Sequence, residues 1–213
     1  MKKYAFLLLA FLLVSIASMA QISTLKLPAP KYTSTKSLDQ LLAKRSSSRA
    51  FSNKDLSEQD LSNLLWAAFG INRPESGKRT APTAMNWQDI TIYLTLETGV
   101  YHYEPKAHTL IKVMEKDVRK ETGMQDFVKN VPVNIVYVSD FDRMGDAIAE
   151  QKKMYSAAHS GFIGQNVYLF CTAYGLNTVF RGAINRELIH QTLQLKPHQH
   201  VVFCQSVGWP PNN

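Results

Sequence analysis

Cysteine is scarce in this sequence: Cys171 and Cys204 are the only two among 213 residues. Two cysteines cannot form the multiple disulfides that stabilise small secreted scaffolds. Each lies in an apolar segment, where a buried free thiol is the commoner state, so a disulfide is permitted but not implied. C-x-x-C spacing is also absent, which excludes the redox and zinc motifs that are built on it.

The usual catalytic and nucleotide-binding motifs are missing too. The sequence contains no G-x-G-x-x-G, P-loop, G-x-S-x-G or H-E-x-x-H pattern. His198 and His200 are alternate residues that could ligate a metal, but no cysteine or carboxylate beside them completes a ligand set, and surface histidines are the commoner interpretation. Asp140 and Asp142 end a predicted strand, where turn and N-cap roles are usual. We therefore predict neither a metal site nor a catalytic side chain.

Only one long apolar run is present, and it lies at the N-terminus. Lys2 and Lys3 precede a run from Ala5 to about Ala17, which is followed by small residues up to Ala20. This pattern predicts a secretory signal peptide at residues 1–20, and the run is short for a membrane span of about 20 residues. Cleavage would leave 213 − 20 = 193 residues. We expect an exported protein, periplasmic or secreted, with no membrane association after cleavage.

The charge balance is moderately basic. There are 24 Lys and Arg against 17 Asp and Glu, a formal net charge of +7, which falls to +5 without Lys2 and Lys3. That balance is compatible with an anionic cofactor or substrate. The basic residues are scattered and do not interleave with aromatic residues, so nucleic acid is not expected as a partner.

After the signal peptide, the pattern divides the chain into an arm and one domain. Residues 21–36 have little periodicity and predict an extended arm that is mobile or laid against the body or a neighbouring subunit. Residues 37–213 suit a single domain. Capping boxes at Ser37 and Ser57 open two helices, the second of which ends at Gly70. Further helical segments are expected at 113–120, 123–130, 142–155, 156–174 and 185–193, and strands at 89–97, 100–103, 131–139, 176–180 and 201–207.

Strands and helices alternate without an internal repeat. This order predicts an α+β fold or a three-layer α/β sandwich around one mixed central sheet flanked by helices. Residues 71–86 follow no periodic pattern, and a loop of that length within a compact domain is usually functional or disordered.

A cluster of arginine and serine precedes the second helix. Arg45-Ser46-Ser47-Ser48-Arg49 places two guanidinium groups around three hydroxyl groups, a composition suited to binding a phosphate. The alternative is an ordinary loop, because arginine and serine are common loop residues.

Two further polar segments invite the same question. Asn86 and Gln88, in the segment APTAMNWQ, could hydrogen-bond the edge of a heterocycle, and Gly182 after a predicted strand could let backbone N–H groups approach a planar ligand. Strand-start capping and an ordinary turn are the simpler explanations of these residues. Each segment taken alone favours the simpler explanation.

In order and spacing, however, the three segments resemble the nitroreductase family of FMN-dependent oxidoreductases. The segment RSSSRAF resembles the N-terminal signature of the family, and the segment APTAMNWQ resembles its P-S-x-x-N-x-Q loop. The segment from Gly164 to Asn185 resembles its central helix, strand and flavin-facing turn, and VGWP resembles its terminal strand. The resemblance covers about residues 37–210. It is closest to the short branch that includes azoline dehydrogenases, where GVYHYEP also has a counterpart.

The resemblance implies a fold, a cofactor and a site. It implies a nitroreductase-like three-layer sandwich and an obligate homodimer with FMN at the subunit interface. One subunit would hold the phosphate and the pyrimidine edge with Arg45, Ser46, Ser47 and Arg49, and its backbone at Arg181 and Gly182 would donate to the N5/O4 side. Pro82, Thr83, Ala84 and Asn86 would reach the flavin from the other subunit, supported by Gln88. The flavin would pass electrons to a nitroaromatic, quinone-like or other conjugated small acceptor by a ping-pong scheme.

Two departures from the family keep alternatives open. Many relatives add a C-terminal basic pair to the phosphate site, whereas this sequence ends in Pro-Pro-Asn-Asn. The phosphate would then be held by fewer cations, or by Arg73, Lys78 or Arg79 from the long loop. Nicotinamide donors are not normally available outside the cytoplasm, so an exported enzyme would need another donor. The alternative function is a non-enzymatic periplasmic flavin-binding or interaction protein that retains the fold.

Overall fold

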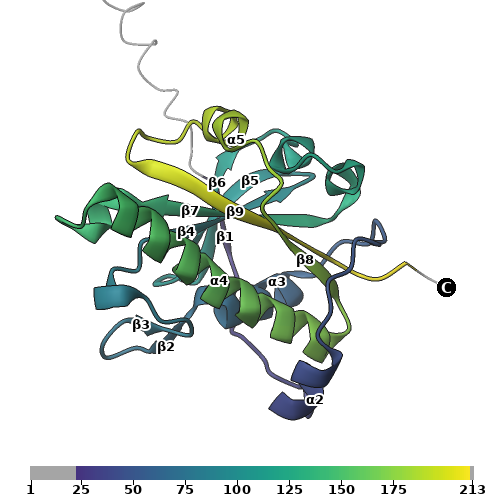
Figure 1. The fold of residues 1–213 in the computed structure, drawn as a ribbon. Coiled ribbons are helices and arrows are strands. Elements are labelled where there is room, and N and C mark those ends of the chain that lie inside the picture. The colour runs from purple at the N-terminus through teal and green to yellow at the C-terminus, as the bar shows by residue number, and fades with distance from the viewer. Residues whose placement is uncertain (1–22, 212–213) are drawn as a thin grey trace, which may run out of the picture.

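The computed structural model describes residues 23–211, so the predicted signal peptide lies outside the described residues. A seven-stranded sheet in the order β1-β6-β5-β4-β7-β9-β8 forms the centre of the fold (Figure 1). Its strands are β1 (Thr24–Lys26), β4 (Ile90–Leu96), β5 (Gly99–Glu104), β6 (Thr109–Met114), β7 (Val133–Asp140), β8 (Asn177–Arg181) and β9 (Gln199–Gly208). A separate hairpin joins β2 (Ile71–Arg73) to β3 (Lys78–Arg79).

Helices cover both faces of this sheet. The α-helices are α2 (Leu38–Lys44), α3 (Glu58–Phe69), α4 (Ala149–Tyr174) and α5 (Arg186–Thr192). On one face, α3 and α4 pack on side chains such as Ile135 and Tyr137, whereas α5 packs on Val136 and Val138 of the opposite face. Successive residues of β7 thus enter different cores, as strand geometry requires. The expected α+β, three-layer arrangement is confirmed.

The strand pairing differs from the expected mixed sheet in one respect. Every strand pair of the seven-stranded sheet in residues 23–211 is antiparallel. Helix α4 connects β7 to β8, and these two strands run in the same direction, but β9 lies between them and is antiparallel to both. The two strands that α4 connects are therefore parallel but not neighbours.

The helix boundaries follow the capping signals. Ser37 and Ser57 accept hydrogen bonds from the backbone N–H groups of Gln40 and Asp60, and both capping boxes are complete. Gly175 ends α4 in the left-handed conformation, with φ of 76°, which glycine adopts without steric cost. Within residues 23–211 we find no helix whose length and apolar character would suit a bilayer crossing.

Three predicted segments are different in the structure. Residues 113–130 were expected to be helical, but 109–114 form β6, and the rest includes only the 3-10 turns η2 (Arg119–Thr122) and η3 (Asp126–Asn130). Residues 142–174 form one turn, η4 (Phe141–Met144), and the single 26-residue helix α4 rather than two helices. Residues 71–86 contain the β2–β3 hairpin and the turn η1 (Ala84–Asn86).

The arm is laid against the body of the same chain. β1 pairs with β6 at the sheet edge, and Leu27 is buried. Ser62 of α3 donates to the carbonyl of Pro28, and its Oγ also lies 2.8 Å from Nε2 of His108. Further along, Nζ of Lys36 donates to the last carbonyl groups of α4. Thr24–Lys26 of the arm is therefore an integral strand of the fold.

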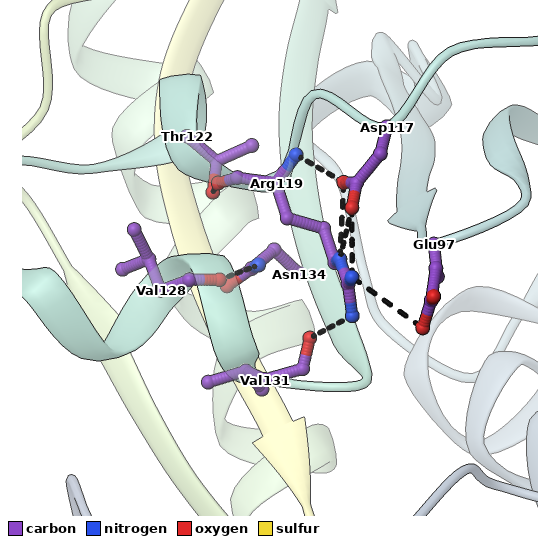
Figure 2. Close-up of polar contacts among 7 residues, drawn as sticks. All are labelled: Glu97, Asp117, Arg119, Thr122, Val128, Val131 and Asn134. Carbon is purple, nitrogen blue, oxygen red and sulfur yellow. Dashed lines mark hydrogen bonds and ion pairs between the residues drawn. The ribbon is translucent and has the colours of Figure 1, made fainter. Parts of the chain in front are cut away.

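Arg119 fastens the segment between β6 and β7 to the sheet (Figure 2). Its guanidinium binds both carboxylate oxygens of Asp117, at 2.7–3.1 Å, lies 3.6 Å from Glu97 in the β4–β5 turn and donates to the carbonyl of Val131. Asn134 of β7 donates to the carbonyl of Val128 in the same segment. These contacts order a stretch that has little regular secondary structure.

Candidate functional site

The Arg-Ser cluster lies along the free edge of β8. The backbone N–H of Ser48 donates to the carbonyl of Thr178, and Asn177 donates to the carbonyl of Ala50. Oγ of Ser47 is 2.7 Å from the hydroxyl of Tyr168, which accepts a hydrogen bond from the backbone N–H of Phe180. The loop is therefore held at several points against β8 and α4.

The cationic groups of this loop are free to bind an anion. The guanidinium of Arg45 lies over the ring of Tyr168, 5.1 Å from its centroid. Neither Arg45 nor Arg49 has a side-chain hydrogen bond or ion pair within residues 23–211, and Ser46, Ser47 and Arg49 are exposed. An unpaired guanidinium beside exposed hydroxyl groups is a chemically suitable set of donors for a phosphate.

Gly182 continues the same edge. It follows β8 directly and is exposed, and a Cβ placed on it would meet only the ring of Phe203, at 3.5 Å. Beyond Arg181, β9 has no partner strand on this side, because β8 pairs with β9 only from Cys204 onward. A largely apolar cavity of about 330 Å³ lies against this unpaired part of β9, between Phe203 and the first half of α4. The Arg-Ser cluster and Gly182 thus flank one strand.

The side chain of Arg181 points away from this edge. It is buried, and it donates to the carbonyl of Thr122, to Oγ of Ser206 and to Oδ1 of Asn134, at 2.8–3.2 Å. A Cβ on Gly123 would lie 2.0 Å from this guanidinium, so Gly123 makes room for it. Arg181 can therefore contribute only its backbone to a site beyond β8, as the resemblance implied.

The APTAMNWQ segment lies on another part of the molecule. Pro82 and Asn86 are exposed. The backbone is strained in η1 and just after it, since Met85, Asn86 and Gln88 all have positive φ between 47° and 56°. Gln88 stabilises this turn, because its backbone N–H donates to Oγ1 of Thr83 and its amide donates to Oδ1 of Asn86. The supporting role expected of Gln88 agrees with these contacts.

A buried polar network that the sequence analysis missed anchors this segment. Nε2 of His159 accepts a hydrogen bond from the backbone N–H of Ala84, so the ring proton lies on Nδ1, 2.6 Å from Oδ1 of Asp89. The second oxygen of Asp89 accepts from Ser139, which also contacts Ser156. All four side chains of the network are buried. Nothing in the sequence links Asp89 to His159, because the two are 70 positions apart. The one available signal was the position of His159 on the apolar side of α4, which favours a structural role.

The two halves of the predicted site therefore do not meet within one chain. His159, which binds the APTAMNWQ segment, and Tyr168, which binds the Arg-Ser cluster, are nine residues apart on α4, about 2.5 turns or 14 Å, and so lie on opposite flanks of the helix. Between these flanks, α4 exposes Met154, Ala158, Phe162 and Gln165, which repeat at helical spacing. Figure 1 shows α4 crossing the sheet with the β2–β3 hairpin on one side and β8 on the other.

The expected substitutes for a C-terminal basic pair are not near the Arg-Ser cluster of the same chain. Arg73 donates to Asn72 and to the carbonyl of Arg79, and Arg79 donates to Gln88 and to the carbonyl of Phe69. Both arginines thus stabilise the β2–β3 hairpin and its junction with Gln88.

The structure also brings together residues that the sequence kept apart. Ligand atoms of Asp140, Asp142 and His198 lie within 4.8 Å of one another, so carboxylates do stand beside this histidine in space. One oxygen of Asp140 already accepts the backbone N–H of Asp142, which is the N-cap role that we predicted. Cys171 and Cys204 are free thiols, and burial raises both pKa values, that of Cys204 to about 12, so neither is a nucleophile at neutral pH.

Comparison with known proteins places this arrangement in a family. The sequence profile of the nitroreductase family matches residues 42–209. The crystal structure of a candidate nitroreductase from Ralstonia eutropha JMP134 superposes with a TM-score of 0.85 and is 35% identical, covering 89% of this chain and 90% of that one. A candidate nitroreductase of Methanocaldococcus jannaschii is 29% identical over 171 residues, 76% of this chain and 86% of the relative.

A chain of the E. coli microcin synthetase complex also has this fold, with a TM-score of 0.68, 19% identity, and coverage of 94% of this chain and 82% of that chain. That likeness shows the fold alone. The family match and the Ralstonia structure show more. The fold is that of the nitroreductases, and the chain belongs to the nitroreductase family of oxidoreductases.

Proposed function

We propose that this chain is an FMN-dependent oxidoreductase whose flavin site is completed only in a homodimer. Arg45, Ser46, Ser47, Arg49 and the backbone of Arg181 and Gly182 would come from one subunit, and Pro82, Thr83, Ala84 and Asn86 from the other. The observation that carries the proposal is that these two sets lie on opposite flanks of α4 in one chain. A two-fold related copy packed on the exposed face of α4 would bring the second set to the first.

The exposed face of α4 has the composition of a subunit interface. The side chains of Met154 and Phe162 are 57% and 47% exposed, and Met85 on the neighbouring η1 turn is 83% exposed. Exposed large apolar side chains that follow one helix face are typical of a surface that a partner covers. Gly161 on this face is also exposed, and a Cβ placed on it would meet nothing within 4 Å in the same chain.

The residues of the β8 edge fit the FMN groups that they would hold. The free guanidinium groups of Arg45 and Arg49 and the exposed hydroxyl groups of Ser46 and Ser47 suit a phosphate. The open space above Gly182 suits a planar ring that approaches the backbone. Asn86 of the other subunit keeps its amide nitrogen free, because only its Oδ1 is bonded within residues 23–211.

The chemistry would come from the cofactor, and the protein would position it. When bound, FMN supplies hydride and electron transfer between a donor and a nitroaromatic, quinone-like or other conjugated acceptor in two separate half-reactions. The chain would anchor the phosphate, present backbone N–H groups at Gly182 and place the loop of the partner subunit over the ligand. Export to the periplasm or beyond is also proposed, on the basis of the signal-peptide pattern of residues 1–20.

The visible absorption spectrum of the purified protein with FMN tests the proposal. We expect flavin bands that persist through gel filtration, on a dimer. Arg45→Ala with Arg49→Ala removes two charge-assisted contacts of about 1.5–3 kcal/mol each, so the variant should lose the flavin. As a control, Lys120→Ala with Lys129→Ala removes two positive charges from an exposed surface elsewhere, and this variant should retain the flavin. A colourless protein in excess FMN would refute the proposal, and reducible flavin without turnover would favour the non-enzymatic alternative.

A further inference from the structure

Strands β4 and β5 diverge at one end of the sheet. Their pairing runs from Leu96 and Gly99 to Tyr93 and His102, yet β4 begins at Ile90 and β5 continues to Glu104. Over these last residues, β4 remains paired with β7 and β5 with β6. A cavity of about 250 Å³ lies at the divergence, which we call the β4–β5 cavity.

The β4–β5 cavity combines apolar walls with charged groups from separate elements. Arg79 comes from β3, Arg143 from η4, and His102 and Glu104 from the end of β5. Its apolar and aromatic walls include Phe69, Ile90, Ile92, Tyr93 and Tyr103. The volume is below the roughly 300–1,000 Å³ of pockets for drug-sized ligands, so a small molecule is the appropriate occupant.

The two guanidinium groups that line the cavity are held in place by Gln88. Arg79 donates through Nε to the side-chain oxygen of Gln88, at 2.7 Å, and Arg143 donates through Nη1 to its backbone oxygen, at 3.0 Å. Nη1 of Arg79 donates to the carbonyl of Phe69, which leaves its Nη2 with no acceptor within residues 23–211. Gln88 therefore holds two guanidinium groups at the wall of the cavity.

Two carboxylates, Glu104 and Asp140, lie near these arginines. No ion pair joins Glu104 to Arg79 or Arg143 in the described part of the chain, where Arg143 lies 3.5 Å from Asp140 instead. Burial lowers the pKa of Arg79, whereas nearby Tyr103 and Glu104 raise it, and the charge of Arg143 has a smaller lowering effect. Both arginines stay protonated at neutral pH, so each can donate charge-assisted hydrogen bonds to an anion. The presence of Glu104 favours a singly charged anion over a phosphate.

We propose that the β4–β5 cavity binds a small monocarboxylate with a compact apolar or aromatic body. The carboxylate would lie between Arg79 and Arg143, whose planar forks match its geometry. The body would pack against Phe69, Tyr93 and Tyr103. This site is separate from the β8 edge, and the inference does not rest on the proposed flavin chemistry. Gln88, which holds both arginines, also supports the loop that the proposed function places at the flavin of the partner subunit.

Calorimetric titration of the purified protein with sodium benzoate tests the site. We expect saturable binding of one benzoate per chain, and binding of neutral benzamide at least tenfold weaker, since only benzoate carries the charge. Arg143→Gln and Arg79→Gln each remove one charge-assisted contact and should weaken benzoate binding about tenfold to a hundredfold. Lys78→Gln makes the same charge change next to Arg79 but outside the cavity, and should leave the affinity unchanged.

The result for Arg143→Gln decides the matter, because Arg143 is exposed and its loss leaves the hairpin contacts of Arg79 intact. Unchanged benzoate affinity in this variant, no saturable binding to the wild-type protein, or equal affinity for benzamide would each overturn the inference. The titration is run on protein with and without FMN. Benzoate binding in both forms supports a separate site, whereas competition between benzoate and FMN would contradict it.

Discussion

Two buried or half-buried histidines join segments that are far apart in the sequence. His159 links α4 to Ala84 and Asp89, and His108 links the arm to the sheet. For His108, Ser62 donates to Pro28 and therefore accepts from Nε2–H, which leaves Nδ1 to accept from the hydroxyl of Tyr103, at 2.8 Å. Each ring uses one nitrogen as a donor and the other as an acceptor, which is the pattern of a neutral imidazole.

The stability of the arm should depend on pH through His108. Burial lowers the pKa of His108 below its ordinary value of 6.5. The unfolded chain then takes up a proton first as the pH falls, so stability is lost from about pH 6.5 down through the lower folded pKa and is unaffected above pH 6.5. We expect His108→Gln, which keeps a donor and an acceptor, to have a flatter dependence of unfolding free energy on pH in urea titrations. If the unfolding free energy of His108→Gln depended on pH as steeply as that of the wild-type protein, His108 would not be the source of the dependence. The pKa of His102 is also lowered by burial, so its contribution is present in both proteins.

At the scale of elements, α4 organises the molecule. Its inner face contributes Ile163, Val167 and Phe170 to the larger core, and its flanks carry the contacts to both halves of the predicted site. Gly164 allows α4 to approach β8, because a Cβ there would lie 2.6 Å from the ring of Phe180. Gly161, three residues earlier, has nothing within 4 Å of the corresponding position.

These two glycines should respond oppositely to the same substitution. Gly164→Ala must displace Phe180, which is packed on Tyr137 and Phe203, and overpacking of this kind costs about 1–3 kcal/mol. Gly161→Ala should stabilise α4 by up to about 1 kcal/mol, the difference in helix propensity. Chemical denaturation of both variants measures the contrast. Equal changes in unfolding free energy would show that the contact with Phe180 does not limit the packing. A loss of stability in Gly161→Ala, together with dissociation of the dimer, would place Gly161 in the subunit contact.

At the scale of the whole molecule, the proposed shared site can be tested by mixing two variants, each damaged in a different half of the site. One variant carries Arg45→Ala and Arg49→Ala, and a second carries Asn86→Ala and Thr83→Ala. We expect each homodimer to lose FMN, because every site in it lacks one half. After co-refolding, mixed dimers should contain one intact and one doubly damaged site and bind one FMN per dimer. Flavin absorbance of separately tagged mixed dimers measures this, and no recovery would show that both sets serve a site within one subunit.

Some of the fold follows from local sequence because local interactions decide it. Ser37 and Ser57 cap their helices through contacts three residues away, Gly175 ends α4 by its own conformational freedom, and the apolar run of β7 reports burial on both faces. The family resemblance of three short motifs likewise required only order and spacing, and the profile match confirms it.

Other features of the fold were decided only by the tertiary structure, because they depend on contacts between residues that are distant in the sequence. Thr109–Met114 becomes a strand because β1 and β5 pair with it on both sides, and β9 inserts between β7 and β8, the two strands that α4 connects. Asp89 and His159 meet across 70 positions, and the β4–β5 cavity exists because two strands diverge. The sequence thus named the candidate residues of the proposed flavin site, while the packing of α4 places the two sets on opposite flanks of this helix, which is why the proposed site needs a second subunit.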